Sequence, residues 1–163
     1  MHLKQLIADY LSGIDSLRRA VAGLSPEQLR ARPFLGTWST LEVVCHLADF
    51  ELIDAVRIKR TLAEERPVIF DMDERPLVAA LAYDRRDLNE ELAVIEATRR
   101  HVARILAAQP DAVLARPSDY RVGGSSEERS LEWHLVKVVE HVPHHVAFIL
   151  EKRRAMGVTD PPT

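Results

Sequence analysis

The stretch SLEWHLVKVVEHVPHHVAFILEKRR, residues 130–154, has the apolar period of a long amphipathic helix. Its apolar side chains recur every three or four positions and so share one side of a helix: Leu131, Leu135, Val138, Val142, Val146 and Ile149. Four of the seven histidines of the chain lie between positions 134 and 145. The stretch therefore predicts both a core-forming helix, ending before Gly157, and a candidate site along its edge.

Three other long helices are predicted from the same period. They cover about residues 2–22, 40–65 and 84–108. The core side of the second should consist of Leu41, Val44, Leu47, Phe50 and Leu52 or Ile53, and that of the third of Leu88, Leu92, Ile95, Val102 and Leu106. Ser39 with Glu42 forms a capping pattern at the start of the second helix, and residues 25–28 (SPEQ) predict a short additional helix.

The segments between these helices show no convincing strand alternation. Residues 66–82 predict an irregular crossing with a few turns, and a polar connection containing Gly123 and Gly124 follows Pro110. The expected fold class is all-α, an antiparallel four-helix bundle with a long crossing link between the second and third long helices. We expect one domain over residues 1–157 and a frayed tail over 158–163.

Composition limits the classes of partner. The chain has 163 residues, a net charge of −3 and a pI near 6.2, so neither nucleic acid nor a membrane is expected as the main partner. No apolar run reaches the roughly 20 residues of a membrane span, and the N-terminus lacks a secretory apolar region. The single cysteine, Cys45, fits a reducing interior and is expected to be a core filler. These features predict a cytoplasmic protein with a small-molecule substrate.

His141 and His145 are the first candidate metal ligands. Residues four apart lie one turn, about 6 Å, apart on a helix, so both rings project from one face. His46, in the second long helix, is the candidate for a third nitrogen ligand. Glu42 and Asp49 share its face and could orient its ring, as carboxylates do beside ligating histidines. The alternative is a buried histidine in a local salt-bridged network.

The remaining histidines are weaker candidates. His134 lies about 10 Å along the helix axis from His141, too far to share one ion with both ligands, so a supporting, entrance or surface role is expected. His144 points about 100° away from His145 and is interpreted as a flank residue. His2 and His101 lack polar partners at helical spacing and are expected at the surface.

Pro143 lies between the two candidate ligands. A proline inside a helix removes a backbone donor and clashes with the preceding turn, which predicts a kink. The kink either aims His141 and His145 or is a tolerated bend without a role.

Two motifs resemble a known family. Residues 38–51, WSTLEVVCHLADFE, are similar to the hallmark W-S-x-x-E-x-x-x-H-L-x-D of the DinB-like, or YfiT-like, metal-dependent superfamily. Residues 140–150, EHVPHHVAFIL, resemble its second hallmark, a histidine pair four apart on the last helix. The segments at 57–74 and 81–88 also resemble its link between the second and third helices.

The resemblance covers about residues 30–156 and implies a four-helix bundle, often dimeric, so a homodimer is expected. It implies three histidines on one divalent ion (nickel, zinc or iron), carried over by position as His46, His141 and His145. Relatives include transferases that use low-molecular-weight thiols such as bacillithiol or mycothiol, and the mycothiol-dependent maleylpyruvate isomerase. The chain departs from the family at residues 147–149 (AFI), where a glutamine often follows the final histidine.

Three neutral imidazoles would leave open positions on the ion, as in catalytic rather than structural sites. An ion that stabilises a thiolate makes a thiol nucleophilic at neutral pH, so the leading hypothesis is a metal-dependent thiol S-transferase acting on small electrophiles. Asp49 would orient a ligand or accept a proton, and Glu42 would orient. Arg57 would either steady an anionic substrate or be a solvated helix charge.

Three alternatives stay open. The same ion could activate water, which gives a metal-dependent hydrolase. The ion could instead tie two helices together in a non-catalytic, stress-associated bundle. A bundle without metal, with a dimer surface as its function, is the third alternative.

Overall fold

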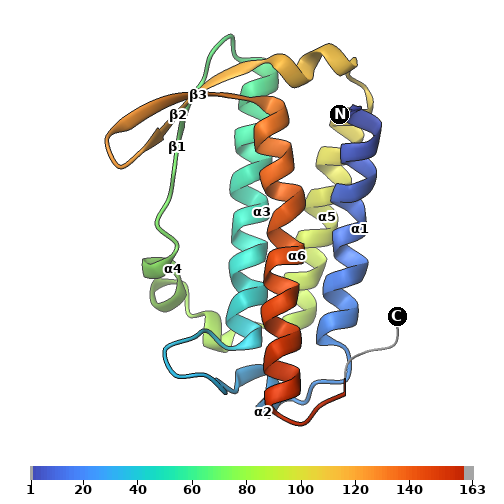
Figure 1. The fold of residues 1–163 in the computed structure, drawn as a ribbon, viewed down its shortest axis with the longest axis vertical. Helices are drawn as coiled ribbons and strands as arrows, with labels where there is room; N and C mark the ends of the chain where they lie inside the picture. Colours follow the sequence, from blue (N-terminus) through green and yellow to red (C-terminus); the bar gives the residue numbers. More distant parts are fainter. Residues whose placement is uncertain (1, 160–163) are drawn as a thin grey trace.

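Four long helices form a bundle in the computed structural model, which describes residues 2–159 (Figure 1). They are α1 (Leu3–Val21), α3 (Thr40–Ala63), α5 (Leu88–Ala107) and α6 (Leu131–Ala155). The predicted four-helix bundle is confirmed, and each predicted helix end lies within a few residues of the observed one. Residues 160–163 of the predicted frayed tail lie outside the described part of the chain.

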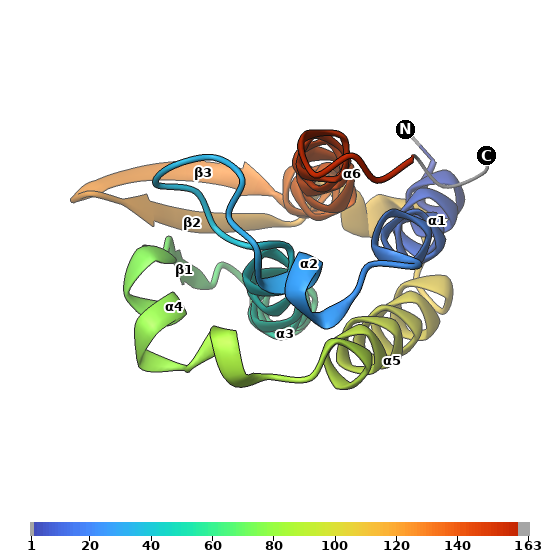
Figure 2. The same cartoon turned by 90° about the horizontal axis from the view of Figure 1, so that it is seen from below.

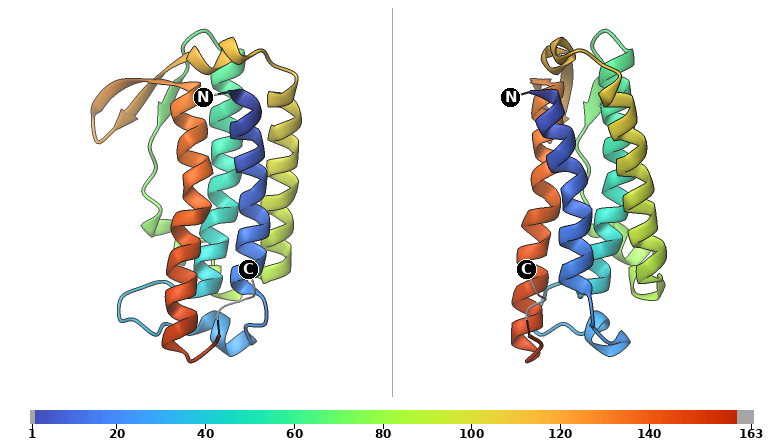
Figure 3. Two further views of the ribbon diagram at one scale, coloured as in Figure 1. Left: turned by 45° about the vertical axis from the view of Figure 1, so that its right-hand side comes forward. Right: turned by 90° about the vertical axis from the view of Figure 1, so that its right-hand side faces the viewer.

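The helices form a ring in which α1 and α3 each pack against both α5 and α6 (Figure 2). The neighbours α3 and α6 run in opposite directions, whereas α3 and α5 run in the same direction (Figure 3). The crossing link causes the second arrangement, because residues 64–87 return the chain along the bundle before α5 begins. The predicted long link is therefore what sets the order of the helices.

Capping side chains define where the helices begin. The capping boxes expected at Ser25 and Ser39 are both formed, at α2 (Pro26–Arg30) and at α3. Helix α5 begins later than the expected position 84, after a 3₁₀ turn, η1 (Tyr83–Arg85). The reason is Asp87, whose side chain accepts hydrogen bonds from the backbone N–H groups of Asn89 and Glu90.

The expectation of no strands was wrong. A three-stranded sheet has the order β1-β2-β3, with β1 (Val68–Phe70) parallel to β2 (Pro117–Val122) and β2 antiparallel to β3 (Ser125–Ser130). Strand β1 has only three residues, and β2 and β3 carry mostly polar side chains, so no apolar alternation marks the strands in the sequence. Gly123 and Gly124 have positive φ in the hairpin turn, which other residues rarely adopt.

The sheet joins the two long connections of the bundle. Strand β1 belongs to the crossing link, which also contains α4 (Arg75–Ala80), and strand β2 follows the 3₁₀ turn η2 (Asp111–Ala115) after α5. Their parallel pairing, with Ile69 opposite Tyr120, holds the link against the hairpin beside α3 and α6.

The predicted core positions are buried with few exceptions. Leu52 is exposed, Ile53, Leu88 and Val146 are half-buried, and the other predicted core positions of α3, α5 and α6 are buried. Val44 and Leu47 of α3 pack with Ile95 of α5 and with Val142 of α6 in one apolar cluster. Apolar contact between α3 and α6 therefore does not depend on the histidines.

A buried ionic network crosses the middle of this core. The Arg99 guanidinium on α5 forms an ion pair with Glu51 on α3 and donates to the Tyr10 carbonyl on α1, and both charged side chains are almost fully inaccessible. The Tyr10 hydroxyl donates to Glu51 at 2.8 Å, and the Val138 carbonyl on α6 lies 3.5 Å from Arg99. Gly13 provides the space, because a methyl group there would collide with the guanidinium. One arginine thus links all four long helices.

Within residues 2–159, no helix combines the length and apolar character required to cross a membrane.

Candidate metal centre

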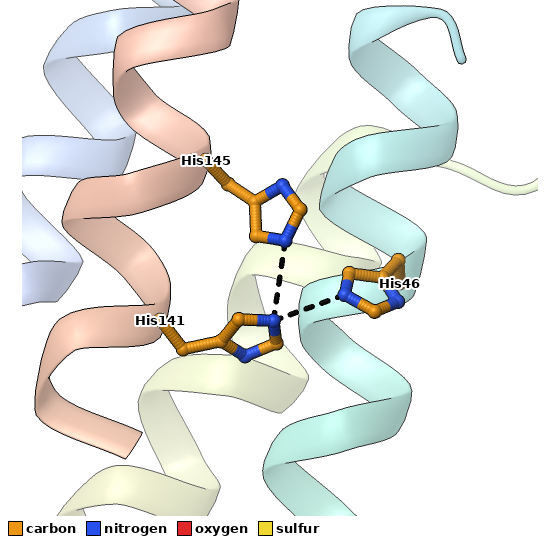
Figure 4. Close-up of side chains that lie close together, drawn as sticks. All are labelled: His46, His141 and His145. Atoms are coloured by element: carbon orange, nitrogen blue, oxygen red, sulfur yellow. Dashed lines mark hydrogen bonds between the residues drawn. The ribbon is translucent and has the colours of Figure 1, made fainter. Parts of the chain in front are cut away.

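His46, His141 and His145 bring their Nε2 atoms together between α3 and α6 (Figure 4). The Nε2 atom of His141 lies 3.0 Å from that of His46 and 3.2 Å from that of His145. One ligand nitrogen from each of the three rings lies within 4.8 Å of the other two. The structure thus brings together the three candidate ligands, although His46 and His141 lie 95 positions apart in the sequence.

The helical frame positions each ring. His141 and His145 stack on one face of α6, and His46 faces them from α3 between the rings of Trp38 and Phe50, at centroid distances of 5.1 and 4.6 Å. Burial between aromatic rings limits the rotation of the His46 imidazole. The three nitrogen atoms are therefore held in place before any ligand binds.

The predicted kink at Pro143 does not interrupt α6. The helix is continuous from Leu131 to Ala155 with Pro143 inside it, and its ribbon shows no sharp change of direction along its length (Figure 3). The Pro143 ring itself is exposed. The aim of His141 and His145 comes from ordinary helical spacing.

The donor set fits one divalent ion. Two nitrogen ligands at 2.0–2.1 Å from a tetrahedral ion lie about 3.4 Å apart. The separations from His141 to His46 and to His145, 3.0 and 3.2 Å, are close to this value, and the third separation lies within 4.8 Å. No fourth histidine, cysteine or carboxylate of residues 2–159 joins the group. The three imidazoles would therefore leave at least one position for water or substrate.

The protonation state of the rings also suits metal binding. Burial, together with the neighbouring imidazoles, lowers the pKa of His46, His141 and His145 to about 3 each. All three rings are thus neutral at pH 7, and each can offer a nitrogen lone pair.

This burial predicts acid sensitivity of the metal-free protein. The unfolded chain binds more protons than the folded one between the ordinary histidine pKa near 6.5 and the lowered values near 3. The free energy of unfolding should therefore fall on acidification, by about 1–2 kcal/mol per histidine between pH 7 and pH 5. Urea denaturation at both pH values measures the fall. His46→Ala should show a smaller fall, and equal falls would contradict this account.

The two expected carboxylate partners of His46 make other contacts. Glu42 closes the capping box with the Ser39 N–H and pairs with Arg32. Asp49 accepts a hydrogen bond from the Tyr83 hydroxyl at 2.7 Å and pairs with Arg86 at 3.1 Å.

Neither carboxylate orients His46, so that expectation was wrong. Glu42 accepts a hydrogen bond from a backbone N–H group that is free at the start of the helix. Asp49 binds a tyrosine and an arginine in the segment that precedes α5, outside the four long helices. The buried Nδ1 atom of His46 has no hydrogen-bond partner. Its ring is positioned by aromatic contacts instead.

The other histidines lie outside the metal group. His134 is buried rather than at the surface, and its Nε2 atom lies 2.8 Å from the Ser118 hydroxyl of β2. His144 is exposed on the flank of α6, as predicted. His2 and His101 are exposed, although His2 contacts Asp111, a partner distant in sequence.

The side chains of Cys45 and Arg57 are both largely removed from solvent. Burial raises the pKa of the Cys45 thiol to about 12, which agrees with a core filler. The Arg57 side chain is only 12% exposed, pairs with Asp54 at 2.9 Å and donates to the Phe70 carbonyl. The interpretation of Arg57 as a solvated charge was therefore wrong.

Two cavities reach the histidine group. One, of about 390 Å³, is lined by His145 with Phe34, Trp38, Phe148 and Lys152 among others. The second, of about 410 Å³, is lined by His141 and by polar side chains that include Asp54, Arg57, His134 and Lys137. Both volumes lie in the range of small-molecule sites.

The cavity next to His145 contains residues that sequence reasoning missed. Lys152 follows His145 by two helical turns, and Phe148 lies between them, so helical spacing beyond the histidine pair could have found both. Trp38 opens the first family motif, which assigned it no role in a cavity, and Phe34 lies in the loop before α3 without a comparable signal.

Comparison with known proteins identifies the family to which this chain belongs. The DinB superfamily profile matches residues 11–149. A Bacillus licheniformis protein named "Putative metal-dependent hydrolase" is 31% identical over 155 residues, which cover 95% of this chain and 87% of that protein. YfiT of Bacillus subtilis, which has the same description in its name, is 30% identical over 141 residues, covering 86% and 78%.

Comparison with solved structures supports the same family. Bacillus subtilis YfiT, described as "a probable metal-dependent hydrolase with an unusual four-helix bundle topology", matches with a TM-score of 0.88 at 27% identity, covering 96% of this chain and 89% of that one. A DinB-like protein of the same organism shares the fold, with a TM-score of 0.64 at 17% identity. The motifs at residues 38–51 and 140–150 are thus correctly interpreted, and the chain belongs to the DinB superfamily.

Proposed function

We propose that this protein is a hydrolase that depends on one divalent metal ion held by His46, His141 and His145. The observation that carries the proposal is the convergence of three neutral imidazoles, one buried and two half-buried, with no fourth protein ligand within residues 2–159. The names of the YfiT-like relatives also specify metal-dependent hydrolysis. The preference for thiol transfer that the family resemblance suggested therefore becomes the second candidate.

The residues of the chain prepare this chemistry in three ways. The imidazoles keep their Nε2 lone pairs free at neutral pH, because burial holds their pKa values low. Trp38 and Phe50 restrict the His46 ring and exclude water from its sides. A divalent ion bound there supplies Lewis acidity, which polarises a carbonyl or phosphoryl group and makes water nucleophilic near neutral pH.

One observation favours the second candidate, transfer of a low-molecular-weight thiol to a small electrophile. A water nucleophile needs a group that accepts its proton, yet Glu42 and Asp49 are held in other contacts. Glu151 is the only carboxylate among the residues that line the cavity next to His145. The pKa of a thiol is far below that of water, so a thiol bound at the ion would lose its proton with less help from a protein base.

An activity screen on protein of defined metal content tests both candidates. Zinc-, nickel- and iron-loaded protein should hydrolyse an activated ester or phosphoester at least about 100-fold faster than metal-free protein. His145→Ala should lose this rate and His101→Ala, an exposed histidine, should keep it. Equal rates with and without metal would contradict the hydrolase.

The thiol arm of the screen uses bacillithiol, mycothiol and glutathione with an aryl chloride electrophile. Metal-dependent consumption of one thiol, without ester or phosphoester hydrolysis, would support the second candidate instead. If neither arm responds although one ion binds per chain, the remaining account is an ion that ties α3 to α6.

A further inference from the structure

The cavity next to His145 has an apolar wall and one buried cation. Phe34, Trp38 and Phe148 supply aromatic surface, and Lys152 lies on the same side of α6 as His145. Side chains on a helix lean toward its N-terminus, so the long Lys152 side chain extends back toward His145. The cavity therefore joins the metal group, an aromatic wall and an ammonium group, and the exposed Glu151 carboxylate also lines it.

Lys152 is the only buried lysine of residues 2–159, with 4% of its surface exposed. A buried ammonium normally has a carboxylate partner, since removing the charge from water is costly. The charge of Glu151, its neighbour in sequence, acts on the Lys152 ammonium without forming an ion pair with it. The Nζ atom lies 5.9 Å from the centroid of the Phe148 ring.

The second cavity differs in this respect. Arg57 there is paired with Asp54, Arg129 is paired with Glu127, and His134 bonds to a serine hydroxyl. An incoming anion would have to break the existing contacts of Arg57 and Arg129, whereas Lys137, which also lines this cavity, is exposed and keeps its ammonium group in water. Lys152 has no pair to break, and an anion in its cavity would supply the missing partner.

We propose that the cavity lined by Phe34, Trp38, His145, Phe148 and Lys152 binds the substrate, and that this substrate is a small molecule with an apolar, preferably aromatic, body and one anionic group held by Lys152. The reaction of the bound molecule rests on the proposed hydrolase function, whereas its binding in the cavity does not. Lys152 acts as a binding residue: its backbone lies two turns beyond His145, and its side chain extends back from there along the cavity.

Benzoate and benzyl alcohol are matched probes, because they share an aromatic ring and differ in charge. Trp38 lines the cavity, so its fluorescence in a Trp133→Phe background reports occupancy. The titrations use protein kept metal-free with a chelator, so that benzoate cannot bind through an ion. Benzoate should bind about 10- to 100-fold more tightly than benzyl alcohol.

Variants assign the preference to Lys152. Lys152→Met should remove it, Lys152→Arg should retain most of it, and Lys59→Met, at an exposed position of α3, should leave it unchanged. Circular dichroism checks that each variant is folded.

Equal affinity for the two probes, no binding of either, or a benzoate preference that survives Lys152→Met would overturn the proposal. Because these titrations need neither metal nor turnover, their outcome is independent of the hydrolase. A positive result with a catalytically silent protein would leave the binding inference intact.

Discussion

Replacing His46 with alanine should abolish stoichiometric metal binding. The wild-type chain is expected to bind about one ion, and loss of one of three ligands should lower the affinity by at least about 100-fold. The ring at position 46 supplies the only ligand from α3, and the two rings on α6 cannot enclose an ion without it. Elemental analysis of tag-free protein after dialysis against a stated zinc concentration measures the loss.

The same variant separates a catalytic from a structural ion. Val44 and Leu47 of α3 pack with Val142 of α6 whether or not metal is present, so metal-free wild type and His46→Ala should melt within a few degrees of each other. Zinc should raise the Tm of the wild type alone, by mass action. His101→Ala is the matched control and should bind metal normally. Full zinc binding by His46→Ala would overturn the assigned ligand set.

Replacing Arg99 with methionine should destabilise the fold by about 3–5 kcal/mol, the range for a buried ion pair that loses one partner. The change leaves the Glu51 carboxylate inside the bundle with only the Tyr10 hydroxyl as a partner. It also removes the bonds from Arg99 to α1 and α6. Urea denaturation of the metal-free protein at pH 7 measures the loss.

Two further variants test the cause. Arg100→Met removes a neighbouring arginine whose side chain is 68% exposed, and it should cost no more than about 1 kcal/mol. Adding Glu51→Leu to Arg99→Met removes the unpaired charge and should recover a large part of the stability. Additive losses in the double variant would show that charge burial is not the cause.

Most of the fold could be predicted because its signals are local. Apolar period and capping residues, such as Ser39 with Glu42 and Ser25 with Gln28, place the helices within a few residues. The sheet could not be predicted, because β1 pairs with β2 across about fifty residues and the strands have little apolar side to alternate. The parallel direction of α3 and α5 likewise depends on the path of the crossing link.

The metal group could be predicted, but its surroundings could not. Helical spacing brings His141 and His145 together, and motif resemblance adds His46. The partners assumed for His46 failed because spacing shows which residues share a face and not which competing partner a carboxylate prefers. Asp49 instead binds Tyr83 and Arg86, which lie more than thirty positions away in sequence.

Gly13 and Arg99 have an evolutionary consequence as a pair. A side chain at position 13 can be accommodated only if the guanidinium moves or is lost, and Arg99 can occupy its site only while position 13 stays bare. Neither residue can drift alone without a period of reduced stability. In lineages that keep this ionic centre, the two positions should be inherited together, and in those that replace the arginine with a shorter residue, selection against larger residues at position 13 should relax.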